Sequence, residues 1–334
     1  MHGACRHVDS QLGVTRLKLF VTRQLPRDVC DAVPADVSLA MYEHEKQAIP
    51  REELLARVAG ARGIVTMLTE RIDEEVMNAA GPQLAVISTM SVGFEHIDRG
   101  AAAQRGIVVC HTPDVLTETT ADLVFALLLA TARQLPQAER ALREGQWGTW
   151  QPFQFLGTDV HGKTIGLLGM GGIAQAVARR ARGFGMRILY WSRSRKSDVE
   201  ETLGVTYSDL TTLLQASDFV VPLLPGGDAT RHLIDQHALS RMKRNAMLIN
   251  ASRGSVVDED ALLQALQTRA IAGAGLDVFA REPIALTHPL LREERVVLLP
   301  HIGSATLETR TSMARRALEN ALLVMRGEAP FDRV

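Results

Sequence analysis

Cysteine is scarce in this chain: Cys5, Cys30 and Cys110 are the three cysteines among 334 residues. Their spacing is neither that of a disulfide framework nor that of a cysteine-bound zinc site. Residues 1–16 also lack the apolar stretch of a secretory signal peptide. We therefore expect no metal and a reducing, cytoplasmic setting.

The chain also lacks a long hydrophobic run and an excess of either charge. Its longest apolar run, 123–130, is far short of the roughly 20 residues that span a bilayer and indicates a buried helix. Lys and Arg number 37 against 38 Asp and Glu, and a net charge of -1 offers no attraction for nucleic acid or an anionic membrane. We expect neither as a partner. The length and the hydrophobic content of 46% fit a globular protein of two domains.

Aromatic residues make up only 4% of the chain, yet Trp147, Trp150, Phe153 and Phe155 all fall within the segment 145–162. Two interpretations stay open for this cluster. It packs onto its own domain as a local hydrophobic staple, or it forms a surface for a partner, as clustered aromatics outside regular elements do at interfaces.

Most of the sequence alternates short apolar runs with helical patterns, which predicts the α/β class, with parallel sheets covered by helices on both faces. The expected strands are 17–21, 63–66, 84–88, 107–110, 164–168, 186–191, 219–223, 247–250, 272–278 and 296–299. The expected helices are 51–59, 72–80, 97–105, 120–143, 175–183, 236–242, 258–267 and 305–326. Thr117 or Thr119 is placed to cap the long helix 120–143. Pro113 breaks the alternation, and we expect the chain to cross between domains there.

The stretch 163–193 has the order strand, glycine turn, helix, strand. Its turn, Gly169-Met170-Gly171-Gly172-Ile173-Ala174, fits Gly-x-Gly-x-x-Gly/Ala. Alone this pattern would indicate only a Gly-rich loop, but the flanking strands favour a dinucleotide-binding fingerprint. Gly169 permits the sharp turn, Gly171 leaves room for a pyrophosphate, and Ala174 lets helix and strand pack closely. The phosphates would bind the free N–H groups at the helix start.

The end of the second strand of this unit bears on the choice of cofactor. An NAD site places Asp or Glu there, about 20 residues past the glycines, to bind the adenosine ribose 2′-hydroxyl. Here the strand is followed by Ser192-Arg193-Ser194-Arg195-Lys196. A hydroxyl flanked by cations accommodates a 2′-phosphate, so we predict that NADPH is preferred over NADH. The alternative is that these cations form an ordinary solvated loop.

Ligands bind beyond the carboxyl ends of parallel strands, and three chemically suited residues follow successive strands there. They are Arg253, Glu282 and His301. Arg253 can hold a carboxylate and a keto oxygen by forked hydrogen bonds, and His301 can protonate a carbonyl oxygen while the cofactor supplies hydride. Glu282 at the other ring nitrogen would favour the charged ring. Each residue alone has an ordinary structural explanation, but together they favour a keto-acid reductase.

Five motifs resemble those of the D-isomer-specific 2-hydroxyacid dehydrogenases. They are Val-Gly-Phe-Glu-His-Ile-Asp (92–98), Thr-Pro-Asp-Val-Leu-Thr-Glu-Thr-Thr-Ala (112–121), Ala-Ser-Arg-Gly (251–254), Gly-Leu-Asp-Val-Phe (275–279) and Leu-Pro-His-Ile-Gly-Ser-Ala (299–305). The resemblance covers nearly the whole chain after Arg16. Within the family the chain is most similar to glyoxylate/hydroxypyruvate reductases, notably at 86–93 and 147–150.

The resemblance implies a Rossmann cofactor domain, 112–299, inserted into a flavodoxin-like substrate domain, 1–111 and 300–334, each a doubly wound parallel sheet. It implies a homodimer that reduces glyoxylate or hydroxypyruvate to the D-2-hydroxy acid with NADPH, with Trp150 entering the neighbour's active site. Arg253, Glu282 and His301 are then catalytic. The substrate-binding residues are Val92 and Gly93 through their N–H groups, Arg253, His301, Ser304 and Trp150. The cofactor-binding residues are Thr119, Gly169, Gly171, Gly172, Ile173, Ser192, Arg193, Arg195, Leu223, Thr230, Ala251, Asp277 and Gly303.

Some positions depart from the family or leave alternatives open. Gly172 stands where members often carry Arg, so one phosphate contact is missing or is made by another group. Val92 stands where phosphite dehydrogenases carry a substrate-binding Lys, which argues against that activity. The absence of a domain after Val334 argues against a long phosphoglycerate dehydrogenase. Reduction of 2-ketogluconate or another larger 2-keto acid stays open, as does an NAD(H)-sensing, corepressor-like binding protein.

Overall fold

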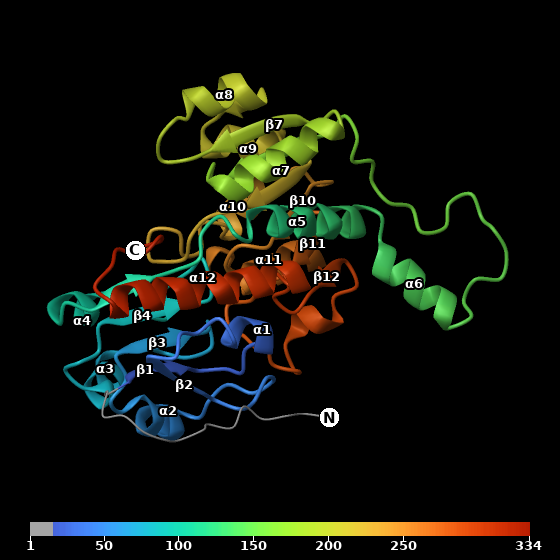
Figure 1. Cartoon of the computed structure of the whole chain (residues 1–334). Coiled ribbons are helices and arrows are strands. Elements are labelled where there is room, and N and C mark those ends of the chain that lie inside the picture. The colour runs from blue at the N-terminus through green and yellow to red at the C-terminus, as the bar shows by residue number, and fades with distance from the viewer. Residues whose placement is uncertain (1–15) are drawn as a thin grey trace. The chain divides into compact units, whose positions relative to one another are not determined.

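The computed structural model describes residues 16–334 (Figure 1). Cys5, and all but the last residue of the segment on which the signal-peptide expectation rests, lie outside the described residues. Contacts divide the chain into two units, Met1–Thr112 with Thr311–Val334, and Pro113–Arg310. The expected boundaries were 111/112 and 299/300. The second boundary falls later because the residues after 299 are bonded within the second unit: the N–H of His301 donates to the carbonyl of Asp277 at 2.8 Å.

The first unit is built on a five-stranded parallel sheet in the order β2-β1-β3-β4-β5, which is the flavodoxin-like order. Its strands are β1 (Leu17–Val21), β2 (Val37–Met41), β3 (Gly63–Thr66), β4 (Val86–Thr89) and β5 (Val108–Cys110). One face is covered by α2 (Arg51–Val58), α3 (Glu74–Ala80) and α4 (Arg99–Gln104). The other face is covered by α1 (Arg27–Cys30) and the later turns of α12 (Leu307–Met325).

The second unit is built on a seven-stranded parallel sheet in the order β12-β11-β10-β9-β6-β7-β8. Its strands are β6 (Thr164–Leu168), β7 (Arg187–Trp191), β8 (Thr206–Tyr207), β9 (Phe219–Pro222), β10 (Met247–Asn250), β11 (Gly273–Leu276) and β12 (Val296–Leu298). Counted from β6, this is the Rossmann order with one further strand at the edge. The predicted fold class, with a Rossmann sheet inserted into a flavodoxin-like one, is therefore confirmed.

Helices cover both faces of the Rossmann sheet (Figure 1). On one side are α5 (Thr117–Ala132), α7 (Gly172–Gly183) and α8 (Ser197–Leu203). On the other side are α9 (Leu210–Ala216), α10 (Gln236–Arg241) and α11 (Glu259–Gln267). Two short 3-10 helices, η1 (Gly254–Val256) and η2 (Pro289–Arg292), lie in loops. The longest apolar run forms part of α5, where Leu128 is fully buried, and no helix of the described chain is long and apolar enough to cross a membrane.

The expected single helix 120–143 is two helices, α5 and α6 (Leu135–Arg143). The break falls at Gln134, whose φ of 52° is left-handed. Pro136 explains it, because a proline inside a helix lacks the N–H and its ring clashes with the carbonyl four residues earlier, here that of Ala132. The expected threonine cap was also wrong. α5 starts after Leu116 without a side-chain cap, and the hydroxyl of Thr119 bonds that of Thr309 at 2.6 Å.

Five strands and helices were not expected from the sequence: the strands β2 and β8 and the helices α1, α8 and α9. The two 3-10 helices, η1 and η2, were not expected either. β2 has five residues, and its polar Ser38 is followed by three apolar ones. The strand therefore shows little of the alternation of apolar and polar residues by which an edge strand is recognised. The other elements lie within a few residues of their predicted ranges.

Candidate active site

The glycine turn after β6 has the open shape that a pyrophosphate needs. Gly169 has a φ of 102°, and a Cβ there would lie 2.5 Å from the carbonyl oxygen of Leu223. A Cβ at Gly171 would meet no atom within 4 Å, so the space in front of the start of α7 is open. Ala174 is 1% exposed and packs in the core. The turn can therefore present the first N–H groups of α7 to a phosphate.

The loop after β7 contains one cation that is already engaged. Arg195 donates Nε and Nη2 to the two carboxylate oxygens of Glu200 at 2.9 and 2.7 Å. The hydroxyl of Tyr190 donates to the same carboxylate at 2.7 Å, and the bonds from Arg195 and Tyr190 lower the pKa of Glu200 to about 2. This acid was not expected from the sequence, because it lies in α8, beyond the end of β7. Arg193 is exposed and forms no ion pair with any described residue.

His301 and Glu282 form a close imidazole–carboxylate pair. His301 Nδ1 lies 2.6 Å from Glu282 Oε2, and the two side chains are 32% and 34% exposed. Burial alone would raise the pKa of Glu282, but the hydrogen bond from His301 and the nearby charges bring that pKa below its ordinary value. An ionised carboxylate only accepts hydrogen bonds, so Nδ1 carries the proton and Nε2 is left for another partner.

Arg253 lies in a loop after β10 that Asn250 holds in place. Asn250 is 1% exposed, its Nδ2 donates to the carbonyl of Arg253 at 3.0 Å, and its Oδ1 accepts from the N–H of Ser252 at 3.1 Å. The loops after β10 and β11 touch directly, because a Cβ on Gly254 would lie 1.8 Å from the carbonyl carbon of Phe279. This role of Asn250 was not predicted from the sequence. Its signal was a polar residue that ends an apolar strand.

Asp277 has a buried carboxylate oxygen without a donor. The residue is fully buried, and Oδ1 accepts from the N–H of Ile302 at 2.8 Å. Among residues 16–334, nothing donates a hydrogen bond to Oδ2, and burial raises the pKa of this carboxyl. A carboxamide N–H₂ group such as that of nicotinamide would supply the missing donor. The residues at this edge therefore fit a nicotinamide cofactor.

Most other predicted site residues of the second unit lie around this same edge of its sheet. Ile173 is in the first turn of α7, the carbonyl of Leu223 borders the glycine turn, and Ala251 follows β10. A Cβ on Gly303 would lie 3.4 Å from Asp277 Oδ2. The hydroxyl of Thr230 donates within its own loop, to the carbonyl of Pro225 at 2.7 Å. Ser304 is buried, and its carbonyl accepts from Arg310 at 3.3 Å.

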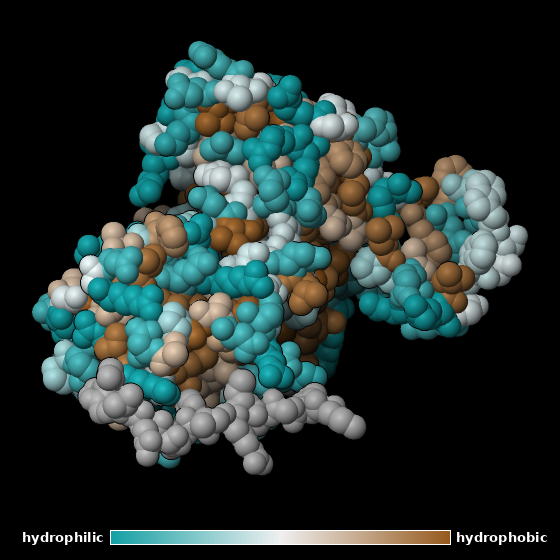
Figure 2. Space-filling view, in the orientation of Figure 1, coloured by the Kyte–Doolittle hydropathy of each residue, from teal (hydrophilic) through white to brown (hydrophobic). Residues whose placement is uncertain are grey.

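The helix α6 and residues 144–156, which include Trp150, form an arm that projects from the second unit (Figure 1). Trp150 is 75% exposed and Phe153 is 82% exposed. Apolar surface is visible on this arm in Figure 2. The interpretation of the cluster as a staple on its own domain was therefore wrong.

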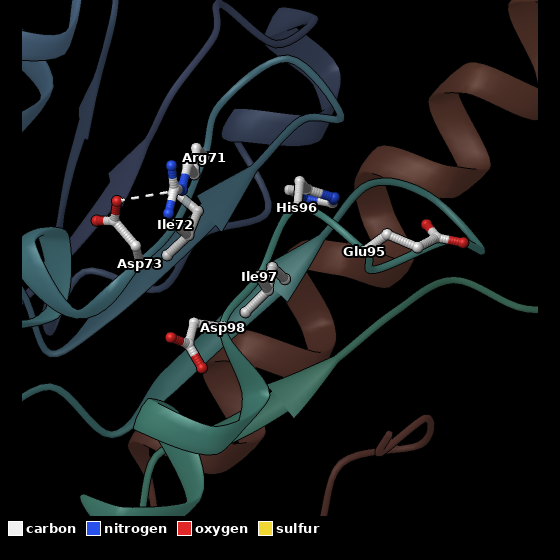
Figure 3. A pocket seen from close by; sticks show the side chains of 7 residues that line it. All are labelled: Arg71, Ile72, Asp73, Glu95, His96, Ile97 and Asp98. Atoms are coloured by element: carbon white, nitrogen blue, oxygen red, sulfur yellow. Dashed lines mark ion pairs between the residues drawn. The ribbon is translucent and has the colours of Figure 1, made fainter. Parts of the chain in front are cut away.

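A pocket of about 400 Å³ lies in the first unit, between residues 71–73 and 95–98 (Figure 3). An ion pair joins Arg71 Nε to Asp73 Oδ2 at 3.4 Å on one side of the pocket, and His96 lies on another. None of the predicted site residues lines it. Across the described chain, no group of three or more His, Cys, Asp or Glu side chains is placed to hold a metal.

A Rossmann sheet with an open glycine turn and a Glu–His pair at its carboxyl edge defines a nicotinamide-dependent oxidoreductase. Residues 125–303 match the sequence model of the D-isomer specific 2-hydroxyacid dehydrogenase, NAD binding domain. The glyoxylate reductase of Korarchaeum cryptofilum is 48% identical over 314 residues, 94% of each chain. The chain belongs to the D-isomer-specific 2-hydroxyacid dehydrogenase family.

Solved structures resemble nearly the whole length of the chain. A Thermus thermophilus protein matches with a TM-score of 0.89 and 44% identity, over 95% of this chain and 100% of that one. The NADPH-dependent glyoxylate/hydroxypyruvate reductase of Sinorhizobium meliloti, in complex with NADP and malonate, matches with a TM-score of 0.82 and 34% identity, over 96% of this chain and 97% of that one.

Proposed function

We propose that this protein is a cytoplasmic reductase of small 2-keto acids, glyoxylate or hydroxypyruvate, and that it forms the D-2-hydroxy acid with NADPH in preference to NADH. The observation that carries the proposal is the 2.6 Å contact between His301 and Glu282 at the carboxyl edge of a Rossmann sheet, with Arg253 on the adjoining loop. The relatives that are glyoxylate reductases support the choice of substrate.

The chain's own residues supply binding and proton transfer. Arg253 holds the substrate carboxylate and keto oxygen by charge-assisted hydrogen bonds. His301 Nε2 gives its proton to the carbonyl oxygen, and Glu282 at Nδ1 orients the ring and favours its charged form. The nicotinamide cofactor supplies the hydride to the carbonyl carbon. Because the side chain of His301 is 32% exposed, it can take up a new proton from water after each turnover.

Two groups of residues would hold the cofactor. Asp277 Oδ2 would accept from the carboxamide, and the turn from Gly169 to Ile173 would bind the pyrophosphate. Ser192 and Arg193 take the adenosine 2′-phosphate. We assign the main contribution to Arg193, because Arg195 is already bonded to Glu200. The remaining residues assigned to cofactor binding are Thr119, Leu223, Thr230, Ala251 and Gly303.

We assign the substrate carboxylate also to the N–H groups of Val92 and Gly93, and substrate contacts to Ser304 and to Trp150 of a second subunit. The exposure of Trp150 and Phe153 supports a homodimer, because large aromatic side chains outside a core commonly anchor interfaces.

Cofactor oxidation assays with a panel of substrates test the proposal. Glyoxylate, hydroxypyruvate, pyruvate and 2-ketogluconate are each offered with NADPH and with NADH. We expect the highest kcat/KM for glyoxylate or hydroxypyruvate with NADPH. A higher kcat/KM for 2-ketogluconate would instead identify a reductase of larger keto acids. Binding of NADH without turnover of any keto acid would identify a corepressor-like binding protein.

A further inference from the structure

The peptide carbonyls of the loop that follows β4 accept hydrogen bonds from other groups of the first unit. The carbonyl of Ser91 accepts from the N–H of Thr112 at 2.9 Å, and the carbonyl of Val92 lies 2.9 Å from His111 Nδ1. The next carbonyl, that of Gly93, accepts from the hydroxyl of Ser91 at 2.5 Å. A carbonyl only accepts, so His111 Nδ1 is the donor in its contact. Three consecutive peptide units of the loop are thus held by hydrogen bonds within the first unit.

These bonds determine where the N–H groups of the loop point. In a planar trans peptide, the C=O and the following N–H point in opposite directions. The bond to the Ser91 carbonyl therefore orients the N–H of Val92, and the bond from His111 orients the N–H of Gly93. In the described part of the chain, neither of these two N–H groups donates a hydrogen bond. Two adjacent N–H groups whose peptides are held and that bond nothing else in the described chain are available to an anionic oxygen.

The ring of His111 is itself held firmly. It packs edge-on against Phe94, with ring centroids 5.7 Å apart and an interplanar angle of 74°. The backbone of His111 is anchored on both sides: its N–H donates to the carbonyl of Asp332 at 3.2 Å, and its carbonyl accepts from Asn320 at 3.2 Å. Asn320 is fully buried in α12. The ring nitrogen is therefore a fixed donor and not a mobile surface group.

A second hydrogen-bonded chain supports the loop through Ser91. The Ser91 hydroxyl donates to Gly93, so it accepts from the Thr89 hydroxyl 2.7 Å away. Thr89 Oγ1 in turn lies 3.2 Å from His96 Nε2, at the edge of the pocket in Figure 3. Thr89 is fully buried and Ser91 is 4% exposed. These hydrogen bonds fix the carbonyl of Gly93. The orientation of the Gly93 N–H depends instead on the bond from His111 to the carbonyl of Val92.

We propose that His111 is a positioning residue for substrate binding, which holds the Val92–Gly93 peptide so that the N–H of Gly93 points at the substrate carboxylate. The inference rests on the proposed function, which assigns that carboxylate to this loop. Loss of the His111 donor frees the peptide to rotate, and the charge-assisted bond from Gly93 weakens. The proton donor His301 lies in the other unit, so substrate binding should suffer far more than the chemical step.

His111→Leu and His111→Asn form the matched pair that tests the inference. Leucine fills similar space without a donor, whereas the asparagine amide can donate from nearly the position of Nδ1. We expect His111→Leu to raise KM for glyoxylate, and Ki for the carboxylate inhibitor oxamate, by about tenfold, with kcat changed by less than about threefold. His111→Asn should restore both constants to within about threefold of the unmodified enzyme. His44→Gln, at an exposed histidine of the same unit, should change neither.

NADPH binding and the melting temperature of each variant report whether it folds. His111→Ala serves as a second donor deletion if the leucine variant does not fold. If the unmodified enzyme reduces glyoxylate and the folded donor deletions keep its KM and Ki, the inference is wrong and the proposed function stands. Equal losses in the asparagine and leucine variants would also overturn it, since they would indicate a purely structural role. If the unmodified enzyme reduces no 2-keto acid, the proposed function fails and the inference fails with it.

Discussion

The Nε2 atom of His301 is the position from which the proposed reaction draws its proton. His301→Ala removes that donor and leaves the cofactor-binding turn untouched. We expect kcat for glyoxylate to fall by about 10² to 10⁴, the usual contribution of general acid catalysis, while NADPH affinity changes little. Steady-state kinetics and NADPH fluorescence titration measure the two effects. His237→Ala, at an exposed histidine of the same unit, is the control. Near-normal turnover in His301→Ala would mean that another group donates the proton.

Glu282 links the site to pH. The hydrogen bond from His301 holds the pKa of Glu282 below its ordinary value. The ionised carboxylate therefore stabilises the fold fully at pH values above the ordinary pKa of a glutamate. This stabilisation is lost as the pH falls through the lowered pKa of Glu282. The carboxylate is an opposite charge beside the His301 ring, with Oε2 2.6 Å from Nδ1. Glu282→Gln removes the charge that supports a protonated proton donor, so the alkaline limb of the kcat profile for reduction should move to lower pH. Profiles of kcat against pH for both enzymes measure the shift. An alkaline limb that stays in place would show that Glu282 does not support the charged imidazole.

At the scale of elements, the segment between β7 and α8 carries the cofactor preference. In the unmodified enzyme we expect kcat/KM for NADPH to exceed that for NADH by at least about tenfold, or 1.4 kcal/mol. Ser192→Asp with Arg193→Ala should reverse the preference, because it removes the attraction for the 2′-phosphate and adds repulsion. Kinetics with both cofactors measure the ratio. Arg187→Ala, at an exposed cation at the other end of β7, should leave it unchanged. Equal kcat/KM for the two cofactors in the unmodified enzyme would refute the assignment.

The arm of α6 and the segment after it is the element through which a second subunit would reach the substrate. Trp150→Ala removes a side chain that is 75% exposed and contributes nothing to the core of its own unit. The fold of the single subunit should therefore stay intact, as circular dichroism of the variant would show. We expect kcat/KM for 2-ketogluconate to rise relative to that for glyoxylate, because the indole limits substrate size. Kinetics with both substrates test this, and an unchanged ratio would place Trp150 outside the site.

At the scale of the whole molecule, the exposed aromatics of the arm predict a homodimer. Burial of several large apolar side chains gives each contact a free energy that scales with the area removed from water, roughly 25 cal/mol per Å². We therefore expect the enzyme to sediment as a dimer at micromolar concentration. Sedimentation velocity combined with an activity assay under the same conditions decides the matter. A fully active monomer would contradict both the dimer and the proposed role of Trp150.

The sequence by itself determined the fold class, the family and the residue types that the site brings together. Hydrophobic periodicity and the glycine turn are local signals in the sequence. Parallel strands place their carboxyl ends at the same edge of a sheet, independently of the conformation of the connecting loops. For this reason Arg253, Glu282 and His301 could be named from their positions after strands. The break at Pro136 was also a local signal, and the helical pattern on both sides concealed it.

Only the tertiary structure decided which side chains hold those residues in place. The contact of His111 with Val92 spans 19 positions, and that of His301 with Glu282 also spans 19. The pair of Arg195 and Glu200 is only five positions apart, but it depends on the helix α8, which the sequence pattern did not predict. A sequence pattern specifies residue type and face, whereas the direction of a hydrogen bond depends on the packing of segments that are distant along the chain. The contact of His111 with Val92, which carries the proposal above, therefore became visible only in the structure.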